Sequence, residues 1–376
     1  MRAASDPVQR RATSKLLRLD ATGEFTHATR FDLPRFIERG DVIVANDAAT
    51  LPASLAATHV RTGERIEIRL AARRSLNPDD VLLFDAIVFG AGNFRTRTEE
   101  RPLPPTLQVG DRLVVGSIHA VIDALLHHPR FVRLRFAATP ADVWRTFATR
   151  GRPIQYAHLN EPLQLWDVWT PFAANPVAYE APSAGFALDW ALLERLHARG
   201  AQFVTLTHAA GISSTGDAEL DQRLPLDEPY LIPEVTARAI RGARERGSRV
   251  IAIGTTVVRA LEAAAINDCC VRAGHGLATQ RIGPSTHLRI VDAMLSGTHE
   301  AGTSHYELLR AFTADEVLRR MSAELETHNY LTHEFGDAVF IEADHSRAPL
   351  RRGSVELRVD WAMPRRSAEL ACAACD

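Results

Sequence analysis

The sequence predicts an α/β protein whose main domain is interrupted by an all-β insertion. Residues 1–58 and 150–376 show buried strand patterns that alternate with amphipathic helix patterns. Residues 59–149 instead contain short alternating runs separated by turn residues, as in a small barrel or sandwich. A chain of 376 residues is long enough for one large domain and one small one. The main domain is therefore expected to be discontinuous in sequence.

The first segment predicts a buried strand that ends in polar residues. A short helix is expected at 33–38, and a turn follows at 40–41. The apolar run 42–45 predicts the strand, and the polar pair Asn46 and Asp47 comes directly after it. Proteins of the α/β class place ligand contacts at this position. The alternative is that the pair only forms an Asx-turn before a loop.

The predicted insertion is rich in strands. Ile66, Ile68 and Leu70 alternate with polar residues, which indicates a strand with one buried face. Similar runs occupy residues 80–90, 110–117 and 130–137.

The pattern returns to α/β after Gly151. One helix is expected to start at the N-cap Asp189 and to stop at Gly200. A second is expected between Pro233 and Gly247. Strands are predicted at 201–208 and 248–253, and a further helix at 257–265.

The C-terminal part predicts a helix, a strand and a tail. Thr313 and Glu316 have the spacing of a capping box at the start of the helix. A strand is expected at 337–342. The Arg- and Ala-rich residues 362–376 are expected to be disordered.

The composition excludes several classes of protein. The 44 basic and 46 acidic residues nearly balance, so any RNA contact must rest on a local basic patch. No apolar run reaches the roughly 20 residues of a membrane helix, so no membrane contact is expected. With only four cysteines in a chain of this size, we expect a reduced, cytoplasmic protein and a monomer. The Cys372 and Cys375 pair has no second ligand pair, so no metal site is expected.

Gly254, Thr255 and Thr256 form the best-placed candidate for ligand binding. They follow a buried strand and open a helix, where free N–H groups and hydroxyls favour an anion. Arg259 lies one turn further on and could hold a carboxylate with two hydrogen bonds. The alternative is that Thr255 merely caps the helix and Arg259 pairs with Glu262 on its surface.

Six motifs occur in order along the chain. They are VIVANDAATLPASL (42–55), APSAGFAL (181–188), VTLTHAAG (204–211), GSRVIAIGTTVVRALE (247–262), IVDAMLSGTH (290–299) and Gly336-Asp337-Ala338. Each motif alone is weak, but their order and spacing hold up to about Ala343, with the all-β insertion between the first and the second. Together they resemble one known family, the S-adenosylmethionine:tRNA ribosyltransferase-isomerases of queuosine biosynthesis.

This resemblance implies a fold and a reaction. The fold is a mixed, half-barrel-like sheet surrounded by helices, with a small inserted β-barrel. The enzyme moves the ribosyl part of S-adenosylmethionine onto the aminomethyl group of a 7-deazaguanine base in tRNA. Adenine and methionine leave, and the sugar becomes an epoxycyclopentanediol. S-adenosylmethionine is thus expected as a substrate and tRNA as a partner, with no prosthetic group.

The resemblance also suggests site residues. Asp47, His299 and Asp337 are the catalytic candidates, because carboxylates and a neutral imidazole can move protons near pH 7. For Asp337, which follows Gly336 at the start of a strand, a role in a turn is an open alternative. The substrate-binding candidates are Asn46, Ser183, Gly185, Gly211, Gly254, Thr255, Thr256 and Arg259.

The chain departs from the family inside the motifs. Small or apolar residues replace polar ones, whereas drift of a core would mostly exchange apolar residues. Ala48, Ala49, Ala187, Thr207, Leu226, Gly297 and Thr298 stand at such positions. Three hypotheses follow: the family reaction on tRNA, the same chemistry on a small amine or deazapurine, or a non-catalytic protein that binds S-adenosylmethionine.

Overall fold

The computed structural model describes residues 1–7, 11 and 13–344. The tail 362–376 and the pair Cys372 and Cys375 lie outside the described residues. Within the described part, no helix combines the length and the apolar character needed to cross a membrane.

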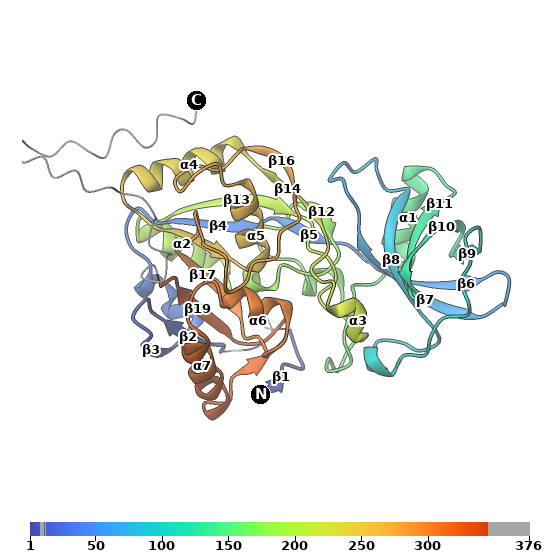
Figure 1. The fold of residues 1–376 in the computed structure, drawn as a ribbon, viewed down its shortest axis with the longest axis horizontal. Helices are drawn as coiled ribbons and strands as arrows, with labels where there is room; N and C mark the ends of the chain where they lie inside the picture. The colour runs from blue at the N-terminus through green and yellow to red at the C-terminus, as the bar shows by residue number, and fades with distance from the viewer. Residues whose placement is uncertain (8–10, 12, 345–376) are drawn as a thin grey trace, which may run out of the picture.

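A mixed sheet forms the centre of the main domain (Figure 1). The described residues give it nine strands, and its four central strands, β13, β4, β15 and β17, run parallel. This confirms the predicted α/β class. In spatial order the strands are β16 (Gly274–Ala278), β14 (Glu228–Ile232), β13 (Gln202–His208), β4 (Val42–Asn46), β15 (Val250–Ile253), β17 (Ala293–Gly297), β19 (Ala338–Glu342), β2 (Lys15–Leu19) and β3 (Phe25–Thr29).

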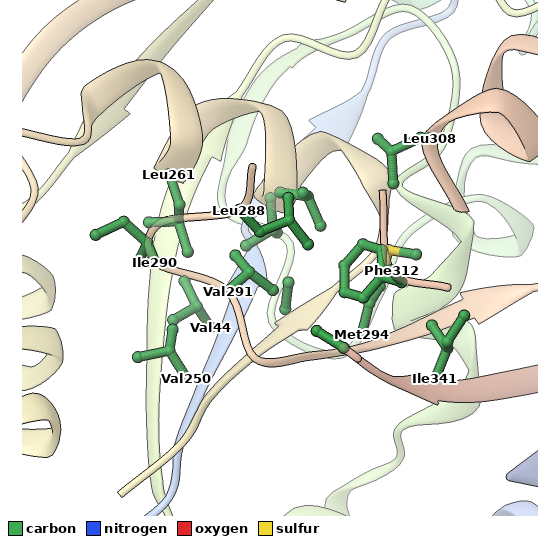
Figure 2. Packing of buried hydrophobic residues seen from close by; sticks show 14 of the residues in the cluster. Val44, Val250, Leu261, Leu288, Ile290, Val291, Met294, Leu308, Phe312 and Ile341 are labelled. Atoms are coloured by element: carbon green, nitrogen blue, oxygen red, sulfur yellow. The ribbon is translucent and has the colours of Figure 1, made fainter. Parts of the chain in front are cut away.

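Strand β4 shows why these strands lie inside. Its residues are all buried, and successive side chains enter opposite cores. Val42 and Val44 belong to one apolar cluster, whereas Ile43 and Ala45 belong to another. Figure 2 shows part of the first cluster, in which Val44 lies near Leu261 of α5.

Helices cover both faces of the sheet. Apolar residues of α4 (Glu234–Glu245), α5 (Thr255–Ala264) and α7 (Asp315–Thr327) pack in the first cluster, with α6 (Ser304–Leu309) beside them. Helix α2 (Trp190–Ala198) packs in the cluster on the other face. The sheet is thus enclosed between helical layers.

Several predicted helix ends are confirmed and two predictions are wrong. Asp189 caps α2 by accepting from the N–H of Leu192 at 2.8 Å, and Gly200 follows with a φ of 91°. The capping box at Thr313 is wrong, because α7 begins after the N-cap Ala314, whose side chain cannot accept a hydrogen bond. The helix expected at 33–38 is instead a 3-10 helix, η2 (Arg30–Phe36).

The inserted segment folds into a closed antiparallel barrel. Its interior contains the alternating residues Ile66, Ile68 and Leu70, and α1 (Pro140–Arg150) packs against it. Its first strand begins at Ser54, before the expected start at residue 59. The strands are β6 (Ser54–His59), β7 (Arg65–Ala72), β8 (Leu83–Phe89), β9 (Arg112–Val115), β10 (Ile118–His128) and β11 (Phe131–Phe136).

An apolar cluster joins the barrel to the main domain. Ala71, Ile87 and Phe89 of the barrel pack with Ile212 and with Leu220 of α3 (Ala218–Asp221). Figure 1 shows α3 between the barrel and the large sheet. The remaining short elements are β1 (Arg2–Ala3), β5 (Ala48–Thr50), η3 (Thr98–Glu100), η4 (Leu165–Asp167), β12 (Asn175–Ala178), η5 (Ser183–Ala187) and β18 (Leu331–Thr332).

Candidate active site

The start of α5 allows a neighbouring segment to approach its backbone closely. Gly254 has a φ of 94°, in the region that favours glycine, and it is the N-cap of α5. A Cβ on Gly254 would lie 3.2 Å from Ala184 of η5, so Ser183 and its neighbours lie against the start of the helix. Since Thr255 is the first helical residue, the alternative in which it caps the helix is wrong.

Gly185 fixes the position of η5. A Cβ there would lie 2.7 Å from a carbon of Thr170 and 2.9 Å from a ring carbon of Phe172. This glycine is therefore needed for packing, which brings the Ser183–Ala187 turn close to Gly254.

Asn46 joins β4 to β13 and to α5. Its Oδ1 accepts from the N–H groups of His208 (2.9 Å) and Ala48 (3.1 Å). Its Nδ2 donates to the carbonyl of His208 at 2.9 Å and to Oγ1 of Thr256 at 3.4 Å. All its polar atoms are used, so Asn46 positions the groups around it.

Arg259 is buried in an ion pair. Its Nη1 donates to Oε2 of Glu228, and its Nη2 donates to the carbonyls of Leu226 (3.1 Å) and Ala278 (3.0 Å). The alternative that pairs it with Glu262 is wrong, because that carboxylate accepts backbone N–H groups of residues 289–291. The carboxylate that Arg259 holds belongs to the protein itself.

His208 completes this group of residues. Its Nε2 lies 3.4 Å from Oε2 of Glu228, and Glu228 also accepts from the N–H of Gly211 at 2.6 Å. Burial and the charge of Arg259 lower the pKa of His208 to about 3, so its imidazole is neutral. Below, the arginine cluster denotes Asn46, His208, Gly211, Glu228, Thr256 and Arg259.

Three buried nitrogen atoms of the arginine cluster have no hydrogen-bond partner among the described residues. They are Nε of Arg259 and both ring nitrogens of His208. Buried polar atoms are nearly always bonded to protein, water or ligand. We therefore take the arginine cluster as the candidate binding site.

Two of the three catalytic candidates, Asp47 and Asp337, lie apart from the arginine cluster. Asp47 points away from it and accepts from the hydroxyls of Thr205 (3.1 Å) and Thr207 (2.6 Å). Since Thr207 and His208 are successive residues of β13, their side chains lie on opposite faces of the sheet. Thr207 stands at one of the positions where the chain departs from the family. Because the adjacent His208 points to the other face, its imidazole does not substitute for a side chain at position 207.

Asp337 binds backbone groups. Its carboxylate accepts from the N–H groups of Lys15 (2.9 Å) and Leu331 (2.8 Å) and from Nη1 of Arg11 (3.2 Å). Asp337 therefore fixes the backbone at the start of β2 and at β18. These contacts favour the alternative in which Asp337 has a role in a turn.

His299 belongs to a row of imidazoles. Its Nε2 lies 2.7 Å from Oγ of Ser296, and its ring stacks on that of His305 with centroids 4.9 Å apart. Burial, His305 and His333 together lower the pKa of His299 well below its usual range. The ring of His333 stacks in turn on that of His158 at 4.4 Å. Below, the histidine row denotes His158, His299, His305 and His333.

His305 is the member of the histidine row that the charge of Arg259 reaches. Burial and that charge lower the pKa of His305 to about 4. At the other end of the row, Nε2 of His158 lies 3.1 Å from Oε2 of Glu334. The effect of Arg259 on His305 indicates that the arginine cluster and the histidine row are neighbours.

Glu180 is a carboxyl group that titrates near neutral pH. Burial raises its pKa to about 7, although it accepts hydrogen bonds from the hydroxyl of Tyr156 and the N–H of Ser213. Groups with a pKa near 7 are suited to accept and return protons. Glu180 is thus a candidate acid or base close to the histidine row.

Comparison with known proteins gives the family. The chain matches the family described as Queuosine biosynthesis protein over residues 1–341. A protein of Sorangium cellulosum named S-adenosylmethionine:tRNA ribosyltransferase-isomerase is 33% identical, and the match covers 90% of this chain and 94% of that protein. A protein of Chlorobaculum parvum with the same name is 30% identical, with coverages of 90% and 96%. This chain belongs to the queuosine biosynthesis protein family.

An S-adenosylmethionine tRNA ribosyltransferase of Thermotoga maritima is among the solved structures that resemble this chain. Its sequence identity is 23% and its TM-score is 0.48, with 90% of this chain and 95% of that chain covered. The predicted family is thus confirmed by the sequence comparisons, and with it the prediction of an enzyme of the ribosyltransferase-isomerase type.

Of the predicted binding residues, the structure brings six together in or beside the arginine cluster, and the turn with Ser183 and Gly185 packs against them. Asp47 and Asp337 are not part of this group. Six residues of this region were not predicted from the sequence: Tyr156, His158, Glu180, His305, His333 and Glu334. Glu180 directly precedes the motif 181–188, and His333 and Glu334 directly precede Phe335 and Gly336, so proximity to motifs was the available signal.

Proposed function

We propose that this member of the queuosine biosynthesis protein family transfers the ribosyl group of S-adenosylmethionine to the aminomethyl group of a 7-deazaguanine base in tRNA. The observation that carries the proposal is the arginine cluster at the start of α5, whose Arg259 Nε and His208 ring nitrogens are buried without partners among the described residues. Such atoms favour a ligand with several acceptors, as S-adenosylmethionine has in its ribose, carboxylate and adenine.

The reaction has requirements that neighbouring residues meet. A base must remove a proton next to the sulfonium, and an acid must assist the departure of adenine. Glu180, with its pKa raised to about 7 by burial, suits either step. His299 is held neutral by burial and by the other imidazoles, so it can accept a proton. We assign these two residues to proton transfer and the arginine cluster to substrate binding.

The deciding experiment measures adenine release. The purified chain is incubated with S-adenosylmethionine and tRNA that carries the aminomethyl-deazaguanine base. The expected result is stoichiometric release of adenine and methionine, with epoxyqueuosine in the digested tRNA by mass spectrometry. Gly254→Val should abolish release, because a side chain at a φ of 94° and 3.2 Å from Ala184 distorts the start of α5. His328→Ala, which changes the exposed end of α7, is the matched control.

A small acceptor is the second candidate. The near balance of 44 basic and 46 acidic residues and the altered motif positions are the observations that support it. It predicts adenine release with the free aminomethyl-deazaguanine base and none with tRNA. Binding of S-adenosylmethionine by calorimetry without adenine release would instead identify a non-catalytic binding protein, and absence of binding would refute all three readings.

A further inference from the structure

One end of the histidine row brings together the donor atoms of a metal site. One ligand atom from each of His158, His333 and Glu334 lies within 4.8 Å of the others. His158 is far in sequence from the adjacent residues His333 and Glu334, which lie in the turn between β18 and β19. We propose that His158, His333 and Glu334 bind a divalent transition-metal ion of the zinc type. This proposal is independent of the proposed function.

The distances suit such an ion. Nε2 of His158 lies 3.1 Å from Oε2 of Glu334. Two ligand atoms at about 2.0–2.1 Å from a tetrahedral zinc ion would be roughly 3.4 Å apart, so only a small shift is needed. The imidazoles of His158 and His333 stack with centroids 4.4 Å apart, which keeps a nitrogen of each ring within reach of one ion.

The chemistry of the donor set also points to this class of metal. Two imidazole nitrogens and one carboxylate suit zinc and its neighbours better than calcium or magnesium, which prefer oxygen ligands throughout. Three protein ligands leave a fourth position for water or substrate. His333 is exposed and the other two are half-buried, so an ion can enter from solvent.

The backbone at His333 has a left-handed conformation. Its φ is 68°, a left-handed conformation that few residues other than glycine adopt. The turn is fixed on both sides: the N–H of Gly336 donates to the carbonyl of His333 at 2.8 Å, and Asp337 accepts from the N–H of Leu331 at 2.8 Å. Asp337 is therefore a positioning residue for this turn.

A second group of similar composition provides the contrast. His27, Glu324 and His328 also lie within 4.8 Å of one another, on the surface at α7. There, Nδ1 of His328 faces the carboxylate of Glu324 at 3.2 Å, but the same nitrogen is already 3.0 Å from the backbone carbonyl of Glu324. Both histidines of this surface group are exposed, and the nitrogen of His328 that would face an ion is used within the protein, so we assign no metal to it.

The test is metal binding by the full chain. The protein is stripped with a chelator and titrated with Zn²⁺ in a calorimeter, and with Co²⁺ followed by visible absorption. One equivalent should bind, with the spectrum of nitrogen and oxygen ligands. His333→Asn and Glu334→Gln should weaken binding at least tenfold, and His328→Ala should leave it unchanged. Asn tolerates the left-handed backbone, so His333→Asn keeps the turn.

Three results would overturn the proposal. They are the absence of stoichiometric binding, equal binding by the wild type and His333→Asn, and loss of binding in His328→Ala. A cobalt spectrum with the strong charge-transfer band of thiolate ligands would assign the ion to cysteines and would also refute the site. Melting temperatures of all variants are compared first, so that unfolding is not mistaken for loss of ligands.

Discussion

The arginine cluster and the histidine row are neighbours, but their polar groups are satisfied in opposite ways. In the arginine cluster, opposite charges and amides bind one another, and Asn46 and Glu228 are used almost completely within the protein. In the histidine row, similar rings stack, and burial together with neighbouring charges keeps His299 and His305 neutral. The first arrangement depends on every member, whereas the second tolerates exchange of single residues.

This difference explains where the sequence keeps its family motifs. Five of the six residues of the arginine cluster fall in the motifs 42–55, 204–211 and 247–262, and only Glu228 lies outside them. In the histidine row only His299 falls in a motif, whereas His158, His305 and His333 lie outside the quoted motifs. Removal of one partner from a closed network of buried charges leaves another charge unpaired and strongly lowers stability. A row of imidazoles at a partly exposed edge can be altered by substitution. Such a substitution would also change the acceptor or the ion that binds there.

The largest effect is expected for Arg259→Ala. This change leaves the buried Glu228 without its cation, so the free energy of unfolding should fall by about 3–5 kcal/mol. Denaturant titration measures the loss. In the double variant Arg259→Met with Glu228→Gln no buried charge remains unpaired, and most of the stability should return. If Arg259→Ala is as stable as the wild type but binds S-adenosylmethionine less tightly, Arg259 serves the ligand and not the fold.

A smaller loss is expected for Asp337→Ala. The change removes the acceptor of two backbone N–H groups and of Arg11, and each buried donor without a partner costs about 1–3 kcal/mol. We expect a total of about 2–4 kcal/mol. Asp47→Ala should cost only about 1 kcal/mol, because Thr205 and Thr207 can turn their hydroxyls toward other acceptors. Equal losses would contradict the structural assignment of Asp337.

These two aspartates also show what the sequence could not reveal. Both follow a motif glycine or asparagine at a strand boundary, and from the sequence both were equal catalytic candidates. Whether a carboxylate meets a ligand or a backbone N–H depends on segments far away in sequence, such as Arg11 and Leu331 for Asp337. Local patterns contain no such information.

The helices and strands were easier to predict than the roles of the site residues. Apolar runs such as 42–45 and 250–253 and caps such as Asp189 follow from local periodicity and chemistry, and the structure confirms them. The failed capping box at Thr313 shows the limit, since the structure has Ala314 as the N-cap. Of the histidine row only His299 was predicted, because His158, His305 and His333 lie outside the motifs and meet only in the fold.

The pH dependence of stability should show the contribution of the buried His208. Its pKa is lowered to about 3 in the folded protein, whereas an unfolded histidine titrates near 6.5. Between these values unfolding takes up a proton, so stability falls as pH falls through this window, by up to about 1.4 kcal/mol per pH unit. His208→Gln should remove that contribution, which is visible as a shallower slope of unfolding free energy against pH. Identical slopes in both proteins would mean that His208 is accessible to protons in the folded state.

The smallest effect is expected for His305→Phe in the histidine row. Phenylalanine keeps a ring against His299 but cannot carry charge, and His305 is one of the groups that lower the pKa of His299. The pKa of His299 should therefore rise, as followed by NMR of the imidazole carbon, while the free energy of unfolding changes by less than about 1 kcal/mol. His305→Ala removes the ring as well and should cost more stability for the same pKa change. If both variants lose several kcal/mol, the row is as interdependent as the arginine cluster, and the contrast between the two regions does not hold.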